Sequence, residues 1–244
     1  MKSLNAGEKS IYLVIPAYGS EPLLMNVVQN IPTYVKKTLL IWDNPVENSL
    51  KRIQSLKKND VEIIIRNERG GIGLALQHGV KRSLECLDKS NGFILFMAGN
   101  GKDNPKEIIN FLHPLYLGYH YIQGSRYLKD GNSKNLPFIR KITNKILPII
   151  WSIIVRKKLS EVTNGFRAYN SIVFKESIIP WYRPDLNGYE WEYYLNYKLL
   201  RSSYRCTEVA VSKIYYKGVN HSKIKLRDGY QILRPIFLCP VNRV

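Results

Sequence analysis

The sequence has few acidic side chains, few cysteines and few histidines. Its 244 residues include 19 Asp and Glu against 37 Lys and Arg, which gives a formal net charge of +18. The three cysteines, Cys86, Cys206 and Cys239, are far apart and form no CxxC pair, which argues against a disulfide framework or a thiolate metal site. The four histidines show no metal-ligand spacing. We therefore expect a protein of a reducing compartment.

Long hydrophobic runs are also missing. The N-terminal MKSLNAGEKS lacks the apolar core of a signal peptide. The longest apolar stretch, residues 146–155, contains Pro148 and Ser152 and is about half as long as the ~20 residues that a transmembrane helix needs. The hydrophobic content of 45% nevertheless excludes a disordered chain. These features predict a cytoplasmic protein whose contact with a membrane is peripheral, at its inner face.

The excess positive charge is concentrated in two segments. Residues 126–158 hold nine basic side chains and one acidic side chain, and residues 201–244 hold nine and two, whereas residues 1–125 hold 15 and 11. Such clustering is typical of proteins that bind a polyanion, such as nucleotide phosphates, a lipid phosphate, an anionic membrane or nucleic acid. We do not expect nucleic acid as the partner, because the sequence carries none of the recognised DNA- or RNA-binding signatures.

Short apolar runs alternate with segments of helical spacing in the first half of the chain. This alternation indicates βαβ units and an α/β fold, with a mostly parallel sheet flanked by helices. The predicted strands cover residues 11–16, 38–42, 61–65, 92–97 and 119–123, and the predicted helices cover residues 21–30, 49–58 and 72–87. After Gly124 the predictions are helices over residues 136–155 and 190–200 and a late strand over residues 206–216.

Polar and glycine-rich segments follow the predicted strands. Ligands of open parallel sheets bind beyond the carboxyl ends of the strands, so we expect these segments to form one site. Glycine lets the backbone approach a ligand closely and offer its N–H groups to phosphates. The segment from Arg69 to Gly73 is neither a GxGxxG fingerprint nor a Walker motif, and taken alone it fits a tightly packed helix start equally well. The segments are residues 17–21, 43–44, 67–71, 98–103 and 124–126.

The order of these motifs resembles family 2 glycosyltransferases of the GT-A fold, and within them the dolichol-phosphate mannose synthase-like branch. The resemblance covers roughly residues 10–225. The segments that carry it are VIPAYGSE (14–21), Asp43, ERGGIGLALQHG (68–79), FMAGNGKDNPKEI (96–108), GSRY (124–127) and VTNGFRAY (162–169). The chain departs from the family at Ile72, where lysine is usual, and at Ala98 and Asn100, where the family has two aspartates.

The resemblance implies a Rossmann-like nucleotide-diphospho-sugar transferase domain. The implied domain covers residues 1–225, with a nucleotide-binding part at about 10–125, an acceptor part at about 126–225, and a short basic and apolar extension at 226–244. The implied activity is a hexosyl-type transfer, with inversion, from a nucleotide-sugar donor to a polyprenyl phosphate or lipid-linked glycan in cell-surface polysaccharide or glycolipid synthesis. A catalytically silent subunit that binds nucleotide-sugar or acts as a scaffold is the alternative, because the two aspartates are missing.

The same resemblance assigns residues to the site. Asp43 corresponds to the acidic residue that contacts the base or ribose, and the Ser222-Lys223 pair corresponds to one that follows a mobile loop over the active site. The residues assigned to the donor are Pro16, Ala17, Tyr18, Glu21, Asp43, Arg69, Gly71, Gly73, Asn100, Lys102, Arg167, Ser222 and Lys223. The residues assigned to catalysis are Asp103, Glu190, Glu192 and Arg126.

Glu190 and Glu192 lie where the family often carries acidic residues near the acceptor. A carboxylate base helps to remove the proton of a hydroxyl acceptor, whereas an ionised phosphate needs no strong base. Positions i and i+2 of a helix do not share a face, so at most one of the two is expected to face the site. A solvated helix carboxylate is the alternative for either residue.

The positions of the missing aspartates leave three interpretations of metal use. Hard cations prefer carboxylate oxygen, which neither Ala98 nor Asn100 offers. In the first interpretation, Asp103, with Asn100 as a neutral ligand, holds Mg²⁺ or Mn²⁺ together with the donor's diphosphate. In the second, basic side chains neutralise the diphosphate without a metal. In the third, catalysis is lost and only binding remains. The cations available to the second are Lys102, Arg126 and Arg167.

Residues 136–158 combine an apolar stretch containing Trp151 with cations at both ends. Arg140 and Lys141 lie near one end, and residues 156–158 lie at the other. This pattern is typical of an interfacial helix on an anionic membrane, and a core helix with charged ends is the alternative. We expect attachment to a membrane to be peripheral, either direct or through a membrane partner protein.

Overall fold

The structure is a computed structural model that describes residues 9–19, 23–55, 60–176 and 178–216. Three residues assigned to the donor, Glu21, Ser222 and Lys223, lie outside the described residues. The helix predicted over residues 21–30 is described as α1 (Leu24–Gln29), and the one predicted over 49–58 as α2 (Glu47–Gln54).

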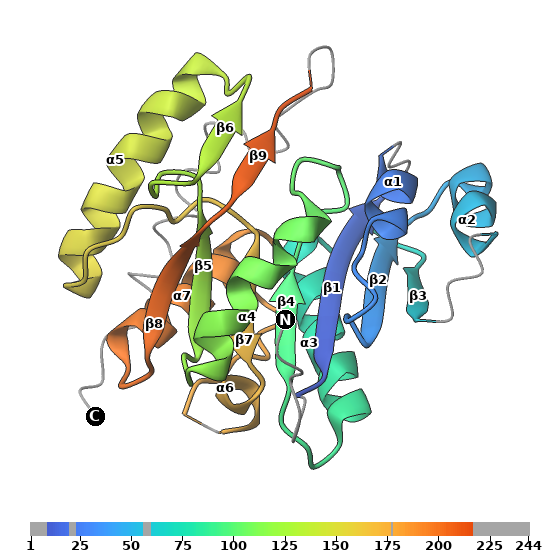
Figure 1. Cartoon of the computed structure of the whole chain (residues 1–244). Helices are drawn as coiled ribbons and strands as arrows, with labels where there is room; N and C mark the ends of the chain where they lie inside the picture. The colour runs from blue at the N-terminus through green and yellow to red at the C-terminus, as the bar shows by residue number, and fades with distance from the viewer. Residues whose placement is uncertain (1–8, 20–22, 56–59, 177, 217–244) are drawn as a thin grey trace.

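A seven-stranded sheet forms the centre of the molecule (Figure 1). Its strands run in the order β3-β2-β1-β4-β7-β5-β8, and only β7 is antiparallel to its neighbours. The predicted α/β class with a mostly parallel sheet is therefore confirmed. The strands are β1 (Ile11–Tyr18), β2 (Lys37–Asp43), β3 (Val61–Arg66), β4 (Phe93–Phe96), β5 (Tyr121–Ser125), β7 (Arg167–Asn170) and β8 (Cys206–Ala210).

Helices cover both faces of this sheet, so its central strands are buried on both sides (Figure 1). Successive side chains of a strand point to opposite faces. Tyr12 and Val14 of β1 accordingly pack with α3 (Ile72–Leu87), whereas Leu13 and Ile15 pack with α1 and α4 (Ile109–Tyr116). This double burial is why the strands read as continuous apolar runs. The first face is completed by α5 (Phe138–Val155), α6 (Ile172–Lys175) and α7 (Glu190–Arg201).

The second half of the chain departs from the prediction at its late strand. The single strand expected over residues 206–216 is wrong, because the chain divides at Val211 into β8 and β9 (Ser212–Ile214). Val211 donates its N–H to Ser125 and accepts one from Asn132, and beyond it β9 pairs with β6 (Asn132–Lys134) in a separate two-stranded sheet. The strand therefore moves from one sheet to the other at a single residue.

Several further elements were not predicted, among them β7, α4 and α6. Strand β7 has the sequence RAYN and contains a buried arginine, so it lacks the apolar run that signals a strand. Helix α4 follows a short 3₁₀ helix, η1 (Pro105–Ile108), and contains Pro114. The predicted boundary near residue 125, between a nucleotide-binding part and an acceptor part, stays a prediction. Strands from before and after this boundary belong to the same sheet.

Candidate functional site

The candidate site lies along the carboxyl edge of the parallel strands. Strands β1 to β5 end at this edge, and β7 begins at it because β7 runs antiparallel. Arg167, the first residue of β7, is paired in register with Phe96 of β4 and Gln123 of β5. We call the part formed by the ends of β1–β3 and the start of α3 the donor side. The part formed by β5, β7, β9 and α7 is called the acceptor side.

Asp43 on the donor side is buried and already paired. Its carboxylate accepts hydrogen bonds from Arg66 Nε at 2.5 Å and Nη2 at 2.6 Å, and from the backbone N–H of Gly70 at 3.1 Å. A bidentate guanidinium of this kind fixes the orientation of a carboxylate. The structure therefore places Asp43 at the end of β2, held beside the glycine-rich segment, and its contact with a base or ribose stays a prediction.

Tyr18 and Arg69 meet at the surface of the donor side. Tyr18 ends β1, and the guanidinium carbon of Arg69 lies 4.8 Å from the centre of its ring, a cation–π distance. Both side chains are exposed, so this pair could present a flat face and a charge to a ligand. Pro16 and Ala17, also assigned to the donor, lie within β1 opposite Ile41 and Trp42.

The glycines at the start of α3 allow close packing against the segment that leads into α7. Gly71 has a φ of +88°, and a Cβ added to it would lie 2.4 Å from the carbonyl oxygen of Asn187. A Cβ on Gly73 would lie 2.4 Å from the carbonyl oxygen of Gly188. No side chain fits at these distances, so the tightly packed helix start considered for this segment is what the structure contains. Contact of these glycines with a donor stays a prediction.

The loop after β4 carries Asp103 into a buried ion pair that the sequence did not reveal. Lys213 Nζ of β9 lies 2.6 Å from Asp103 Oδ1 and donates a second hydrogen bond to Asn164 Oδ1 at 2.9 Å. Asp103 Oδ2 accepts the backbone N–H of Ala98 at 3.3 Å. Asn100 accepts the backbone N–H of Lys102 at 3.2 Å. Asp103 is thus bound on both oxygens.

Two of the three arginines that were assigned to the site, Arg126 and Arg167, are buried beside carboxylates. Arg126 donates to Glu161 at 2.7 Å and to the hydroxyl of Tyr215 at 2.8 Å. Arg167 donates to Glu192 at 2.9 Å and to Gln123 at 3.0 Å. Because each guanidinium charge is compensated by its own carboxylate, these arginines act first as fixed parts of the acceptor side.

The two glutamates of α7 are both buried, so the solvated helix carboxylate considered as an alternative is wrong. They are buried because nearly every residue of α7 is covered by the sheet or by α5. Burial raises the pKa of Glu192, while the charges of Arg167 and Lys213 oppose that rise. Glu190 Oε1 accepts the N–H of Gly188 at 2.9 Å, and within the described residues its Oε2 is buried without a partner. Their catalytic roles stay predictions.

Three cations from separate segments surround the buried ring of Tyr215. Arg126 donates to its hydroxyl, Lys102 Nζ lies 5.4 Å from the ring centre, and the guanidinium carbon of Arg140 lies 5.8 Å from it. We call these four residues the Tyr215 cluster. The motifs did not single out Tyr215 or Arg140 as site residues, although Arg140 belongs to the basic segment that the charge distribution had revealed.

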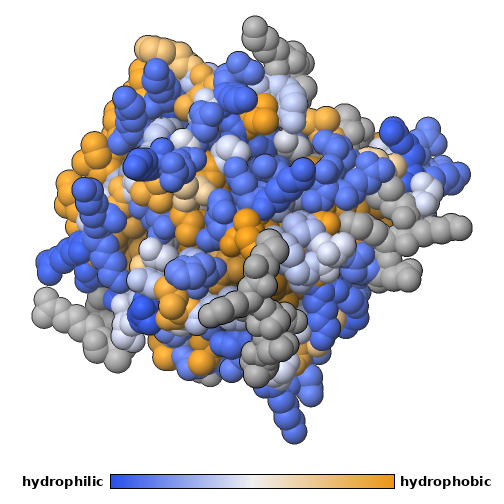
Figure 2. Space-filling view, in the orientation of Figure 1, coloured by the Kyte–Doolittle hydropathy of each residue, from blue (hydrophilic) through white to orange (hydrophobic). Residues whose placement is uncertain are grey.

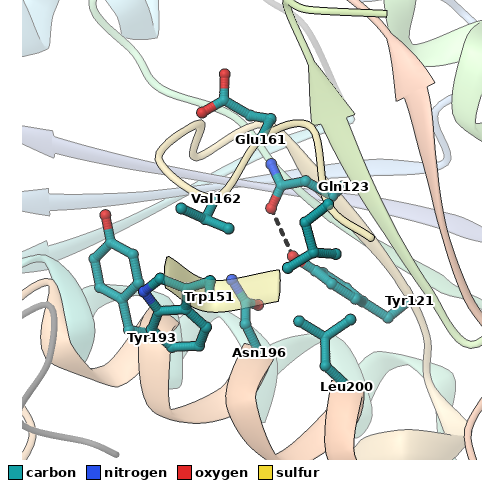
Figure 3. A pocket seen from close by; sticks show the side chains of 9 residues that line it. Tyr121, Gln123, Trp151, Glu161, Val162, Tyr193, Asn196 and Leu200 are labelled. Carbon is teal, nitrogen blue, oxygen red and sulfur yellow. Dashed lines mark hydrogen bonds between the residues drawn. The ribbon is translucent and has the colours of Figure 1, made fainter. Parts of the chain in front are cut away.

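A small cavity lies behind the acceptor side (Figure 3). It is lined by residues of β5, α5 and α7, among them Tyr121, Trp151 and Asn196, and Figure 3 shows the hydrogen bond from Tyr121 to Gln123 beside it. Its volume of about 10 Å³ has room for about one water molecule and none for a sugar or nucleotide. The cavity therefore belongs to the packing beneath the site.

The residues present do not fit a divalent cation. Ala98 has no ligand atom, Asn100 offers a neutral carbonyl, and Asp103 is occupied by the Lys213 ammonium. Mg²⁺ and Mn²⁺ sites normally need one or more available carboxylates. The described residues also contain no group of three or more His, Cys, Asp or Glu side chains that could hold a metal ion. We therefore derive no step of the reaction through a metal.

Comparison with family models found no match. Among curated proteins, the UDP-N-acetylglucosamine–dolichyl-phosphate N-acetylglucosaminyltransferase of Methanococcus voltae is 26% identical over 184 residues, 69% of this chain and 72% of that protein. The polyprenol monophosphomannose synthase of Mycolicibacterium smegmatis is 22% identical over 206 residues, 82% of this chain and 76% of that protein.

Among solved structures, glucosyl-3-phosphoglycerate synthase from Mycobacterium tuberculosis, in complex with Mn²⁺, UDP-glucose and phosphoglyceric acid, is similar with a TM-score of 0.64. The match has 14% sequence identity and covers 96% of this chain and 82% of that one. The fold is therefore that of the GT-A glycosyltransferases. The predicted resemblance to the dolichol-phosphate mannose synthase-like branch is confirmed by the names of the two curated relatives.

Proposed function

We propose that the protein is a glycosyltransferase that moves a sugar from a nucleoside-diphosphate-sugar donor to a polyprenyl phosphate or a lipid-linked glycan. The names of the curated relatives and the GT-A fold support the reaction class. The observation that carries the choice of acceptor is the Tyr215 cluster, which lies beside the start of α5, a helix with an exposed apolar face. Cations next to an apolar surface are what a phosphate on a hydrocarbon chain requires.

The chemistry is a displacement at the anomeric carbon of the donor sugar. An oxygen of the acceptor forms the new bond to this carbon, and the bond from the carbon to the diphosphate breaks, so that the nucleoside diphosphate leaves with the electron pair. Negative charge develops on the leaving diphosphate, and fixed cations stabilise it best when they are already in place. A phosphate acceptor is ionised at neutral pH, so the reaction does not depend on Glu190 or Glu192 acting as a base.

The exposed face of α5 supports contact with a membrane surface. Ile149 and Ile153 are 62% and 74% exposed, and exposed cations flank them on the same helix and just beyond it. Figure 2 shows hydrophobic residues along the edge of the molecule where α5 lies, with hydrophilic residues between them. The exposed apolar residues of α5 are Phe138, Ile142, Ile146, Ile149, Ile150 and Ile153. The exposed cations are Lys141, Lys145, Arg156, Lys157 and Lys158.

This amphipathic pattern fits an interfacial helix on anionic lipid rather than a membrane-spanning one. Within the residues that the structure describes, none of the helices has the length and apolarity to cross a bilayer. Trp151 and Val155, on the opposite side of α5, pack against α7, so only one face of the helix is available to lipid. A location at the inner face of the membrane and a membrane partner protein stay predictions.

A transfer assay tests the proposed reaction. The full chain is incubated with anionic vesicles that contain a short polyprenyl phosphate and, in separate reactions, labelled UDP-, GDP- and dTDP-sugars. We expect labelled sugar in the organic extract for at least one donor, and we expect Arg140→Ala to reduce it about tenfold or more. Lys89→Ala is the matched control, because Lys89 is an exposed lysine that precedes β4 and so lies at the opposite edge of the sheet. Absence of labelled lipid with all donors would contradict the proposal.

Flotation on the same vesicles tests the membrane surface separately. The double variant Ile149→Ser/Ile153→Ser should lose vesicle binding by about tenfold or more, since burial of each apolar side chain in lipid is favourable by roughly 1.5–3 kcal/mol. Ile109→Ser removes an isoleucine of α4 that is 53% exposed and should leave binding unchanged. Equal binding of the double variant and the wild-type protein would refute a role for this face.

The second candidate is a silent subunit that binds a nucleotide-sugar without transferring the sugar. Ala98 and Asn100 favour it, because the family's aspartates are missing from both positions. The two candidates differ in one measurement. A silent subunit shows a thermal shift with a nucleotide-sugar but neither transfer to lipid nor hydrolysis of the donor, whereas the glycosyltransferase shows transfer.

A further inference from the structure

We propose that the ammonium group of Lys213 replaces the divalent cation and binds the diphosphate of the donor directly, so that the protein uses its donor without a metal. This inference rests on the proposed function, because it names how that site holds a nucleoside diphosphate. Lys213 was not among the cations considered from the sequence, which were Lys102, Arg126 and Arg167.

The position of Lys213 is set by the loop that carries the substituted residues. One oxygen of Asp103 holds the Lys213 ammonium at 2.6 Å, and the other oxygen accepts the backbone N–H of Ala98 at 3.3 Å. The ammonium and the backbone of Ala98 are therefore bound to the same carboxylate. Lys213 brings its charge from β9 to the carboxyl edge of β4, the place where the loop would otherwise present a metal.

The ammonium is held in a fixed position and still has a donor to offer. An ammonium group carries three N–H donors. Within the described part of the chain, Asp103 and Asn164 accept two of them, which leaves the third for a phosphate oxygen. The Lys213 side chain is 12% exposed, and that of Asp103 is fully buried. The charge is thus preorganised and partly open, which is what electrostatic stabilisation of a leaving group requires.

The residues at positions 98 and 100 are consistent with the Lys213 ammonium, a single positive charge, in place of a divalent cation. A divalent cation can be shared between carboxylates and a diphosphate, but one ammonium already paired with Asp103 has no charge to offset further carboxylates. An aspartate at either position would place a negative charge beside the diphosphate. Ala98 and Asn100 avoid this repulsion, so Lys213, Ala98 and Asn100 form one consistent set.

Two of the neighbouring cations are less accessible to a ligand than Lys213. Arg126 and Arg167 are also paired with carboxylates, but their side chains are each only 2% exposed, against 12% for Lys213. Lys213 is the cation of a buried pair that is linked directly to the loop after β4. The backbone of the adjacent Ile214 also donates to the carbonyl of Lys102 at 2.9 Å, which keeps β9 against that loop.

Nucleotide binding by the full chain provides the test. Calorimetric titration with UDP and with GDP, each in excess EDTA and in Mn²⁺, should give a Kd for the preferred nucleotide that differs by less than about threefold between the two conditions. Lys213→Met should weaken this binding by about tenfold or more in EDTA. Lys89→Met, at an exposed lysine that precedes β4 and so lies at the opposite edge of the sheet, should bind like the wild-type protein.

Two further variants separate binding from folding. Lys213→Met leaves Asp103 buried without its partner, so the double variant Lys213→Met/Asp103→Asn removes both charges and keeps the packing. We expect it to fold, as judged by circular dichroism, and to bind the nucleotide about tenfold more weakly or worse. Adding Ala98→Asp and Asn100→Asp to Lys213→Met should create binding that needs Mn²⁺, which the wild-type protein does not need.

The outcomes are distinguishable. Binding by the wild-type protein that is lost in EDTA and restored by Mn²⁺ overturns this inference and leaves the proposed function standing. A folded double variant that binds like the wild-type protein also overturns the inference alone. A wild-type protein that binds neither UDP nor GDP in either condition overturns both.

Discussion

The donor side and the acceptor side of the sheet edge are held together by different interactions. Among the described residues, the donor side has one buried ion pair, Arg66–Asp43, which links the neighbouring strands β2 and β3. The acceptor side has three, which join residues 25, 35 and 110 positions apart in the chain. The donor side relies in addition on the glycines of α3, which bring two backbones together. Buried ion pairs thus predominate on the acceptor side, and close backbone packing distinguishes the donor side.

Breaking a buried pair on the acceptor side should have the largest effect on stability. Arg167→Met leaves Glu192 buried without its cation, and the removal of one partner of such a pair typically costs about 3–5 kcal/mol. We expect this loss in the free energy of unfolding, measured by urea denaturation at pH 7. A loss below about 1 kcal/mol would mean that the acceptor side is not held by charge.

The control for this prediction is an exposed ion pair on α2, the helix between strands β2 and β3 of the donor side. Lys51 and Glu47 lie one turn apart on α2, with side chains that are 69% and 77% exposed. Exposed pairs of this kind contribute about 0.3–0.5 kcal/mol, so Lys51→Ala should be nearly neutral in the same experiment.

Adding a methyl group to a glycine should have the next largest effect on stability, but only where that glycine lies on the donor side. The Cβ of Gly73→Ala would lie 2.4 Å from the carbonyl oxygen of Gly188, so α3 or the segment before α7 must move. Overpacking of this kind costs about 1–3 kcal/mol. Urea denaturation measures the loss, and a fall in donor affinity should accompany it if the start of α3 faces the nucleotide.

The matched substitution on the acceptor side is Gly165→Ala. Its Cβ would lie 3.7 Å from Glu192 Oε1, an ordinary contact, and Gly165 has no positive φ that would strain alanine. We expect a change within about 0.5 kcal/mol. If both glycine variants lose the same stability, close backbone packing does not distinguish the two sides.

The same contrast explains which parts of the fold could be predicted from the sequence. Strands β1 to β4 and helix α3 were predicted to within about two residues, because each is an apolar segment whose period reveals its structure. Strand β7 was missed because its buried residues include Arg167, whose charge is compensated by Glu192 on α7. The break at Val211 was missed because it depends on hydrogen bonds to Ser125 and Asn132. None of these three partners lies within the short stretch of sequence from which a strand is predicted.

The site shows the same limit. Motif order placed Asp43, Asp103, Arg126 and Arg167 together at one edge of the sheet, and the structure has them at one edge because parallel strands end together. It did not show that each would be paired, since the partner of Asp103 lies 110 residues away. Lys213 had no motif around it, and the only signal was the excess of basic residues in the last segment.

The pH dependence of Glu192 sharpens the comparison further. Burial raises the pKa of Glu192 from its ordinary value of 4.5, against the opposing charges of Arg167 and Lys213. A carboxyl whose pKa is raised on folding contributes stability below its unfolded pKa, and this contribution is lost as pH rises through the folded pKa. Glu192→Gln cannot titrate and keeps an oxygen for Arg167. The stability of the wild-type protein relative to this variant should therefore fall between pH 4 and pH 7.

Urea denaturation of both proteins at intervals across this pH range measures the difference. We expect a smaller effect than that of Arg167→Met, because the amide retains the hydrogen bond. A difference that rises with pH would mean that the ion pair outweighs burial at this position. Glu47→Gln, at the exposed carboxylate of α2, is the control and should show little dependence on pH.

The smallest perturbation is chemical labelling of the thiol of Cys206, which needs no substitution. Its rate reports how well water is excluded from β8, the neighbour of β5 on the acceptor side. Burial raises the pKa of this thiol, at the start of β8, from 9.0 to about 11. Only the thiolate reacts with iodoacetamide, so at pH 8 about 0.1% of the native thiol is reactive, and the rate should rise about tenfold per pH unit. In urea the thiol regains an ordinary pKa near 8.5, so about a quarter of it is thiolate at pH 8 and labelling should be about 200-fold faster.

Peptide mapping by mass spectrometry separates Cys206 from Cys86, which is half-buried on α3. Equal rates for Cys206 in the native and unfolded chains would mean that water reaches β8, and that the ion pairs of the acceptor side are less well shielded than their burial indicates.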